Sequence, residues 1–122
     1  MSSLKKDHTI EERLELSLLY DFYGALLKEN QRRMFEASVL EDYNFSEIAQ
    51  DEGITRQGVY DTVKRATKQL EMYEEKLGLV SRFREQKKLT KKLRDQLEGM
   101  GVSAMDREWE EVFRLLEEML EE

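Results

Sequence analysis

The residues with the clearest capacity for specific binding gather at positions 45–66, in the stretch FSEIAQDEGITRQGVYDTVKRA. It reads as two helices joined by a sharp turn at Gly53, where glycine would permit a positive φ. Arg56 and Gln57 are residue types that make bidentate hydrogen bonds to base edges. Tyr60 and Lys64 are types that hold phosphates. Ala49 is small where the two helices would touch, and we expect burial of the apolar residues Ile48, Ile54, Val59 and Val63. We interpret the stretch as a helix-turn-helix, with the second helix facing a nucleic acid.

Seven side chains of this second helix and its flanks form the candidate nucleic-acid-binding set. They are Thr55, Arg56, Gln57, Tyr60, Lys64, Arg65 and Lys68. Asp61 lies among them and works against phosphate binding. With about four cations in the motif, log affinity should fall with log salt at a slope of about −3 to −4 per monomer, so one copy should bind weakly. The alternative is a hairpin kept for its shape, with Arg56 and Lys64 merely solvated.

Two further groups of side chains allow a functional and a structural interpretation. Positions 82–94 carry seven cations, which would suit a nucleic-acid backbone, although the nearby Glu85 and Asp95 favour a solvated helix face. The aromatic residues Tyr20, Phe22 and Tyr23 could stack on bases, but their helical spacing favours core packing.

Catalytic chemistry has little support in the sequence. His8 is the only histidine, there is no cysteine, and the paired glutamates near positions 74 and 117 are adjacent rather than facing. The glycines follow neither a phosphate-loop nor a dinucleotide spacing. We therefore expect a protein that is not an enzyme and has no metal or cofactor.

The charge of the chain is unevenly distributed. Its net charge is −7 over 122 residues, but residues 67–98 carry nine basic and six acidic side chains, and residues 99–122 carry two and eight. An acidic chain binds polyanions poorly unless its charges segregate by face. The absence of cysteine, of a signal sequence and of any run of about 18 apolar residues predicts a soluble cytoplasmic protein.

The pattern of apolar residues predicts an all-α fold: a helix-turn-helix bundle with a long recognition helix and C-terminal helices. The first helix should span 10–27, with a capping box at Thr9 and Glu12, and a second, shorter helix should follow the polar break KENQRR at 28–33. Ser46 should cap the third helix, and Thr55 a fourth that runs over 56–77.

The C-terminal part should add a basic helix from about position 81 to the GMG break at 99–101. An acidic last helix should follow, capped by Ser103 with Asp106 and striped with apolar side chains from Met105 to Leu120. Trp109 would anchor a core or a dimer interface. We expect two domains, a helix-turn-helix domain over 1–80 and a helical extension over 81–122.

A seam of apolar residues along the fourth helix predicts a homodimer. The seam residues are Val63, Ala66, Leu70, Tyr73, Leu77 and Val80, spaced alternately three and four apart. This spacing is typical of a helix that packs on another helix. The apolar last helix points the same way, because a short chain has little else with which to cover it.

Positions 18–79, beginning LLYDFYGALLKENQRR and ending VYDTVKRATKQLEMYEEKLGL, resemble the YlxM family of small bacterial DNA-binding proteins. Positions 30–70 also resemble the fourth conserved region of sigma factors, which contacts the promoter −35 element. Family members typically have a proline before the second helix, where this chain has LKENQRR. From Glu98 onward the sequence shows no such resemblance.

The resemblance implies a dimeric helix-turn-helix protein that regulates through DNA and acts with the signal recognition particle, beside whose GTPase gene the family's genes typically lie. Two functions follow from this. In the first, the protein binds DNA or the RNA of the particle. In the second, it is an accessory of the targeting GTPase, its helix-turn-helix serves as scaffold, and its acidic tail meets a basic protein surface.

Overall fold

The computed structural model describes residues 8–121, which form helices and turns with no strand, so the all-α prediction is confirmed. The elements are α1 (Ile10–Tyr23), the 3₁₀ turn η2 (Gly24–Leu26), α2 (Glu29–Phe35), the π-helical segment η3 (Glu36–Leu40), α3 (Phe45–Glu52), α4 (Arg56–Leu77), α5 (Leu79–Gly99) and α6 (Glu110–Leu120). The chain divides into two compact units, one ending at Val80 and the other beginning at Ser81. Each is described by itself.

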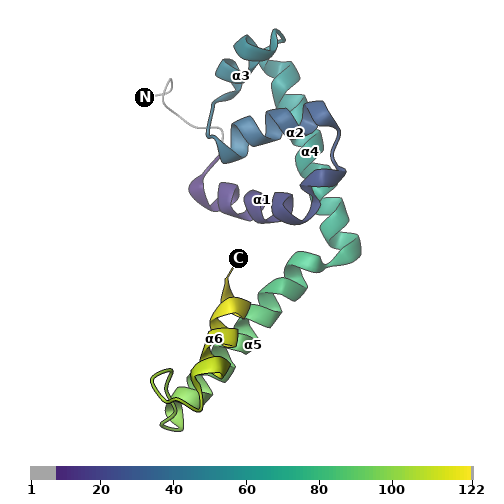
Figure 1. Ribbon diagram of the computed structural model, residues 1–122. Coiled ribbons are helices and arrows are strands. Elements are labelled where there is room, and N and C mark those ends of the chain that lie inside the picture. Colours follow the sequence, from purple (N-terminus) through teal and green to yellow (C-terminus); the bar gives the residue numbers. More distant parts are fainter. Residues whose placement is uncertain (1–7, 122) are drawn as a thin grey trace. The chain divides into compact units, whose positions relative to one another are not determined.

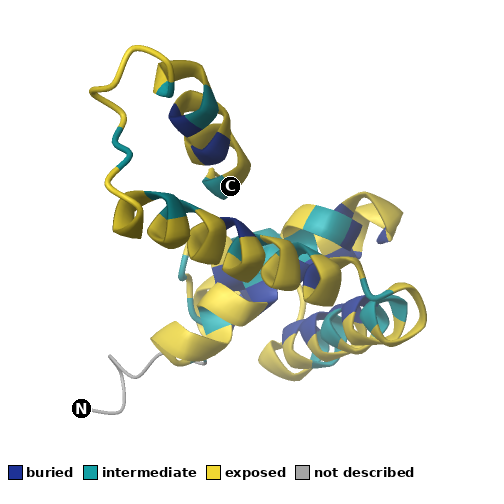
Figure 2. Cartoon of the chain, turned by 90° about the horizontal axis from the view of Figure 1, so that it is seen from below, coloured by how far each residue is buried: buried dark blue, intermediate teal, exposed yellow. Residues whose placement is uncertain are grey.

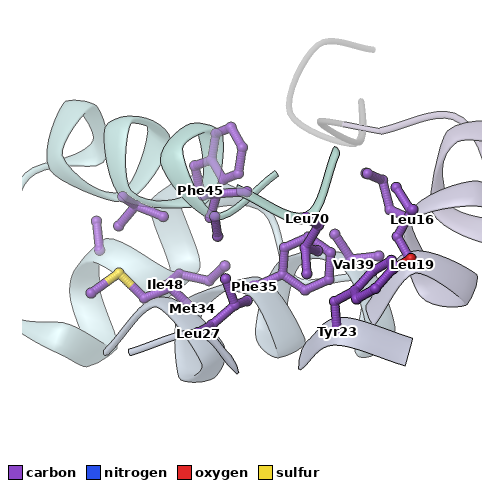
Figure 3. Close-up of a cluster of buried hydrophobic side chains, with 14 of the residues drawn as sticks. Leu16, Leu19, Tyr23, Leu27, Met34, Phe35, Val39, Phe45, Ile48 and Leu70 are labelled. Carbon is purple, nitrogen blue, oxygen red and sulfur yellow. The ribbon is translucent and has the colours of Figure 1, made fainter. Parts of the chain in front are cut away.

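In the first unit, α1, α2 and α3 all pack against α4 (Figure 1). Their contacts enclose one apolar core, part of which is drawn in Figure 3. Phe35 and Leu70 are fully buried there, and the ring of Tyr20 stacks on Phe35 at 5.2 Å. Tyr23 is buried as well, while Phe22 is half-buried against the core. The aromatic residues of α1 therefore serve core packing, as their spacing favours.

The second helix begins earlier than the sequence suggested. The polar residues 29–33, which we expected to form a break, are the first turns of α2. The side chain of Gln31 accepts a hydrogen bond from the backbone N–H of Lys28 at 3.3 Å, which satisfies one of the free donors at the helix start. Arg33 is held by Glu52 of α3. Tertiary contacts thus use the polar side chains that made the segment resemble a loop.

The third helix is capped by Asn44 and not by Ser46. Asn44 Oδ1 accepts from the Glu47 N–H, and Glu47 Oε1 accepts from the Asn44 N–H, both at 2.9 Å. This capping box satisfies two donors at once. The residue three positions after Ser46 is Ala49, whose side chain has no oxygen that could accept a hydrogen bond from the Ser46 N–H. Starting the helix at Phe45 also brings that ring into the core.

The fourth helix has the predicted bounds. Thr55 Oγ1 accepts from the Gly58 N–H at 3.0 Å at its start, and Gly78 ends it in the left-handed conformation, φ +65°. Four of the seam residues, Val63, Ala66, Leu70 and Val80, are buried in the core of their own unit. The expectation that this seam pairs with another chain is therefore wrong, because α1 and α2 cover it.

The second unit contains α5 beyond Val80, a turn region and α6 (Figures 1 and 2). The Ser103 N–H does donate to Asp106 Oδ2 at 3.0 Å, but the Ser103 hydroxyl accepts from the Met105 N–H and not from that of Asp106. The helix itself starts only at Glu110, so the prediction that this pair caps it is wrong. Met105 is 92% exposed in the turn region, which also removes it from the predicted apolar stripe. In the described range, no helix is apolar over a length that would cross a bilayer.

Candidate nucleic-acid interface

The turn between α3 and α4 sets the position of the candidate residues. Gly53 ends α3 with φ +71°, a conformation in which side chains are strained, and its N–H donates to the Ala49 carbonyl at 2.9 Å. Ala49, Ile48, Val59 and Val63 are buried where the two helices meet. The predicted packing of the motif is thus present. Ile54, expected to be buried with them, is instead exposed beside the start of α4.

All seven candidate residues are exposed, at the start of α4 and along its first turns. At about 100° per residue, Gln57, Tyr60, Lys64 and Lys68 fall within about 80° of one another around the helix. Arg56 and Arg65 lie on opposite margins of this strip. From Arg56 to Lys68 the helix rises about 18 Å. The structure therefore brings four of the candidates onto one strip, and it places the two arginines at the strip's edges.

Two aromatic rings support the cations at this end of α4. The Arg56 guanidinium lies 5.5 Å from the centroid of the Phe45 ring, and Lys64 Nζ lies 5.6 Å from that of Tyr60. Phe45 and Tyr60 meet edge to face at 6.0 Å. Cation–π contacts of this kind restrict flexible side chains without removing their charge. Phe45 thus contributes to the site from α3, which our sequence analysis missed; its position directly after the Asn44 cap was the available signal.

Asp61 has a partner on the strip. Its Oδ1 accepts a hydrogen bond from Gln57 Nε2 at 3.0 Å, one turn of α4 earlier. The carboxylate, which we expected to oppose phosphate binding, therefore also orients the Gln57 amide at the start of the helix. The same contact occupies one amide donor that a base edge would otherwise use.

His8 contacts Phe45, the residue whose ring lies beside Arg56. Its Nε2 lies 2.9 Å from Ser38 Oγ, and its ring meets Phe45 edge to face at 5.9 Å. His8, Phe45, Tyr60 and Lys64 also border a small groove of about 250 Å³ between α1 and α4. The only histidine of the chain thus helps to tie the segment before α1 to the Phe45 ring.

Acidic side chains limit the basic strip toward the far end of α4. A hollow of about 370 Å³ beyond Lys64 is lined by Glu11, Glu12, Glu15, Leu16, Thr67 and Glu71. The backbone N–H of Thr9 donates to the Glu12 carboxylate, which lowers the pKa of that residue. Phosphates would be repelled from this region, so only the first turns of α4, up to Lys68, offer them a favourable surface.

A family comparison matches residues 10–111 to the model of UPF0122, described as "Putative helix-turn-helix protein, YlxM / p13 like". The chain belongs to this family. A UPF0122 protein of Thermoanaerobacter sp. strain X514 is 44% identical over 112 residues, covering 92% of this chain and 93% of the relative. Another, from Caldanaerobacter subterraneus, is 51% identical over 85 residues, or 70% and 73% of the two chains. A third, from Halalkalibacterium halodurans, is 34% identical over 110 residues, or 90% and 95%.

The UPF0122 match includes the whole helix-turn-helix and α5. It ends at residue 111, so most of α6 lies beyond it. Membership of the UPF0122 family agrees with the resemblance of positions 18–79 to the YlxM family. Among the described residues, no group of three or more histidine, aspartate or glutamate side chains is arranged to hold a metal ion.

Proposed function

We propose that this UPF0122 protein is a DNA-binding regulatory protein whose contacts are made by the first turns of α4. The observation that carries the proposal is the exposed strip of Gln57, Tyr60, Lys64 and Lys68, with Arg56 beside it on the Phe45 ring. A recognition helix enters the major groove with its N-terminal residues. The acidic hollow past Lys64 keeps the rest of the helix away from phosphate, which favours this end-on approach.

The contacts divide by the chemistry of the side chains. Arg56 and Gln57, at the N-terminal end, suit base edges, while Tyr60, Lys64 and Lys68 suit phosphates. Thr55 caps the helix with its hydroxyl, and Arg65 lies at the margin, where it would reach a neighbouring phosphate. The exposed Ile54 adds an apolar side chain of a kind that contacts thymine methyl groups.

Titration of promoter DNA, random DNA and signal recognition particle RNA at low salt tests the proposal. We expect DNA to bind, and Arg56→Ala with Lys64→Ala to weaken the binding: loss of the Arg56 base contact should cost about 1–3 kcal/mol, and loss of the Lys64 phosphate contact should lower the salt slope by about one. Lys76→Ala is the matched control, because Lys76 is an exposed cation in the last turn of α4, away from the strip. Unchanged affinity of the double variant, or binding of the RNA alone, would contradict a DNA-binding role.

A second candidate function is an accessory of the signal recognition particle GTPase, which the YlxM resemblance implies. It is favoured by a groove of about 460 Å³ lined by Arg33, Glu36, Ala37, Glu41, Tyr43, Glu47, Ile48, Asp51 and Glu52. Five carboxylates around an apolar floor suit a basic protein surface. The acidic tail of residues 99–122 offers a further surface of the same sign.

Pull-down of the purified GTPase separates these possibilities. We expect Asp51→Lys, in the groove, to lower recovery if the groove is the contact, and removal of residues 99–122 to lower it if the tail is. Gln50→Lys, at the exposed neighbouring position of α3, is the control for added charge. Equal recovery of all four proteins would remove both surfaces from this mechanism.

A further inference from the structure

The groove that borders the basic strip of α4 holds the only histidine of the chain. This groove of about 250 Å³, which we call the His8 groove, is lined by His8 and Glu12 from the start of the chain and by Tyr60 and Lys64 of α4, among others. Tyr60 and Lys64 belong to the strip that the proposed function places on DNA. A phosphate held by Lys64 would therefore lie beside the His8 groove.

The net charge of the His8 groove depends on the imidazole. Apart from His8, the ionised residues that line it at neutral pH are Lys64 and Glu12, whose charges cancel. The Thr9 N–H donates to the Glu12 carboxylate, which lowers the pKa of Glu12, so this carboxylate stays ionised in mildly acidic solution. Histidine is the residue whose side chain ordinarily changes its charge between pH 5 and 8. The groove is thus neutral with a neutral His8 and carries one positive charge with a protonated His8.

The contacts of the His8 ring are compatible with a charged imidazole. Its Nε2 lies 2.9 Å from the Oγ of the buried Ser38, and a hydroxyl can accept from an imidazolium as well as donate to a neutral ring. The ring of Phe45, which meets the imidazole edge to face at 5.9 Å, is uncharged. The nearby cations are Lys64 and Arg56, and both are exposed, so solvent screens their repulsion. Among the described residues Nδ1 has no hydrogen-bond partner, and it can donate to a phosphate.

We propose that His8 is a further contact residue of the nucleic-acid interface, whose imidazolium binds a phosphate together with Lys64 at the His8 groove. His8 then adds one cation to the interface in acidic solution and none in alkaline solution. The inference rests on the proposed DNA binding and adds to it a dependence on pH. Affinity for DNA rises as the pH falls through the range in which histidine becomes protonated.

The release of counterions from DNA sets the size of this effect. Each phosphate that a protein neutralises contributes about −0.9 to the slope of log affinity against log salt. The slope should therefore be steeper by about one at pH 5.5 than at pH 8. In 50 mM salt, one such contact corresponds to a gain in affinity of about tenfold.

Fluorescence anisotropy of the full chain with random-sequence duplex DNA, at pH 5.5 and pH 8 and between 20 and 200 mM salt, tests the proposal. We expect the wild type to show the tenfold gain and the steeper slope at pH 5.5. His8→Gln should match the wild type at pH 8 and lose the gain at pH 5.5, since glutamine can bond to Ser38 without becoming charged. His8→Lys, which is charged at both pH values, should show the steeper slope at both.

Glu12→Gln is the matched control for the charge of the groove. Glutamine can replace glutamate in a capping box, so we expect α1 to start as it does in the wild type. The groove then carries one more positive charge at pH 8, so affinity at pH 8 should rise while the gain on acidification remains. The α-amino group also titrates near this range, and comparison with His8→Gln subtracts its contribution. Far-UV circular dichroism at both pH values checks that every variant keeps its helix content.

Three results would overturn the proposal. The first is a wild type with the same affinity and salt slope at both pH values, and the second is a His8→Gln variant that keeps the gain at pH 5.5. The third is a His8→Gln variant that loses affinity equally at both pH values, which would mean that His8 only supports the Phe45 ring. In each case DNA still binds, so the proposed function stands. Absence of DNA binding at both pH values would overturn the proposed function, and this inference with it.

Discussion

At the scale of the residue, the pair Arg33 and Glu52 joins α2 to the end of α3. Arg33 Nε and Nη2 donate to the two carboxylate oxygens of Glu52 at 2.7 and 2.8 Å. A carboxylate at the last position of a helix is unfavourable beside the partial negative charge of the helix end. The guanidinium offsets this and lowers the pKa of Glu52 below its ordinary value of 4.5.

This pKa shift predicts a pH dependence of stability. A carboxyl whose pKa is lower in the folded state stabilises the fold above its unfolded value, and the stabilisation is lost as the pH falls through the folded value. We expect Glu52→Gln to lower the free energy of unfolding at pH 7 by about 1 kcal/mol or less, since Arg33 is half-exposed. The difference from the wild type should shrink as the pH approaches 3.

Urea denaturation between pH 3 and pH 7 measures this difference. Asp51→Asn, at the exposed neighbouring position, is the control, and we expect it to change the pH profile less. A Glu52→Gln variant whose stability runs parallel to that of the wild type over the whole range would contradict the prediction.

At the scale of the element, the start of α5 is held by side chains from two other helices. Tyr23 of α1 donates its hydroxyl to Glu74 Oε1 of α4 at 2.6 Å. The same Tyr23 oxygen accepts from the Leu79 N–H at 3.1 Å, and Glu74 Oε1 accepts from the Val80 N–H at 3.0 Å. These are donors at the start of α5 that have no partner within the helix. Burial raises the pKa of Tyr23, so the hydroxyl remains a donor at neutral pH.

We predict that Tyr23→Phe costs about 1–3 kcal/mol of folding free energy, because it leaves the Leu79 N–H without its acceptor and removes a donor from Glu74. Tyr73→Phe is the matched control, since that ring packs beside Tyr23 at 5.9 Å and is only half-buried. Chemical denaturation at pH 7, followed by circular dichroism, gives both values. A loss for Tyr23→Phe no larger than the loss for Tyr73→Phe would mean that the hydrogen bonds of the Tyr23 hydroxyl do not stabilise the fold.

At the scale of the whole molecule, the charge distribution determines how strongly nucleic acid should bind. The net charge of −7 opposes binding to a polyanion, and on α4 the favourable surface is confined to the strip. One strip neutralises few phosphates. Binding of one chain to DNA should therefore be weak and should depend steeply on salt.

The salt dependence of DNA affinity measures how many phosphates the strip neutralises. We predict a slope of log affinity against log salt of about −3 to −4 for each bound chain, and a slope shallower by about one for the Lys64→Ala variant. Fluorescence anisotropy between 20 and 200 mM salt, about the range in which such slopes are large, measures both. Lys76→Ala, away from the strip, should keep the slope of the wild type. An unchanged slope for Lys64→Ala would mean that Lys64 contacts no phosphate.

Local signals in the sequence determined the helices and the motif. Thr9 with Glu12, Thr55 at the start of α4, and Gly53 and Gly78 at helix ends act through their own backbone neighbours, so their effects are readable from order alone. The all-α class and the exposed candidate strip follow from the same short-range patterns. The residue types of that strip also indicate that it could contact base edges and phosphates.

Tertiary structure decided what distant residues do to one another. The seam from Val63 to Val80 predicted a dimer, yet α1 and α2 bury four of its residues within the chain. Positions 29–33 looked like a break, but Gln31 is buried and Arg33 is paired in helix α2. Spacing alone shows that a helix has an apolar side, whereas only the packed chain shows which side already has a partner.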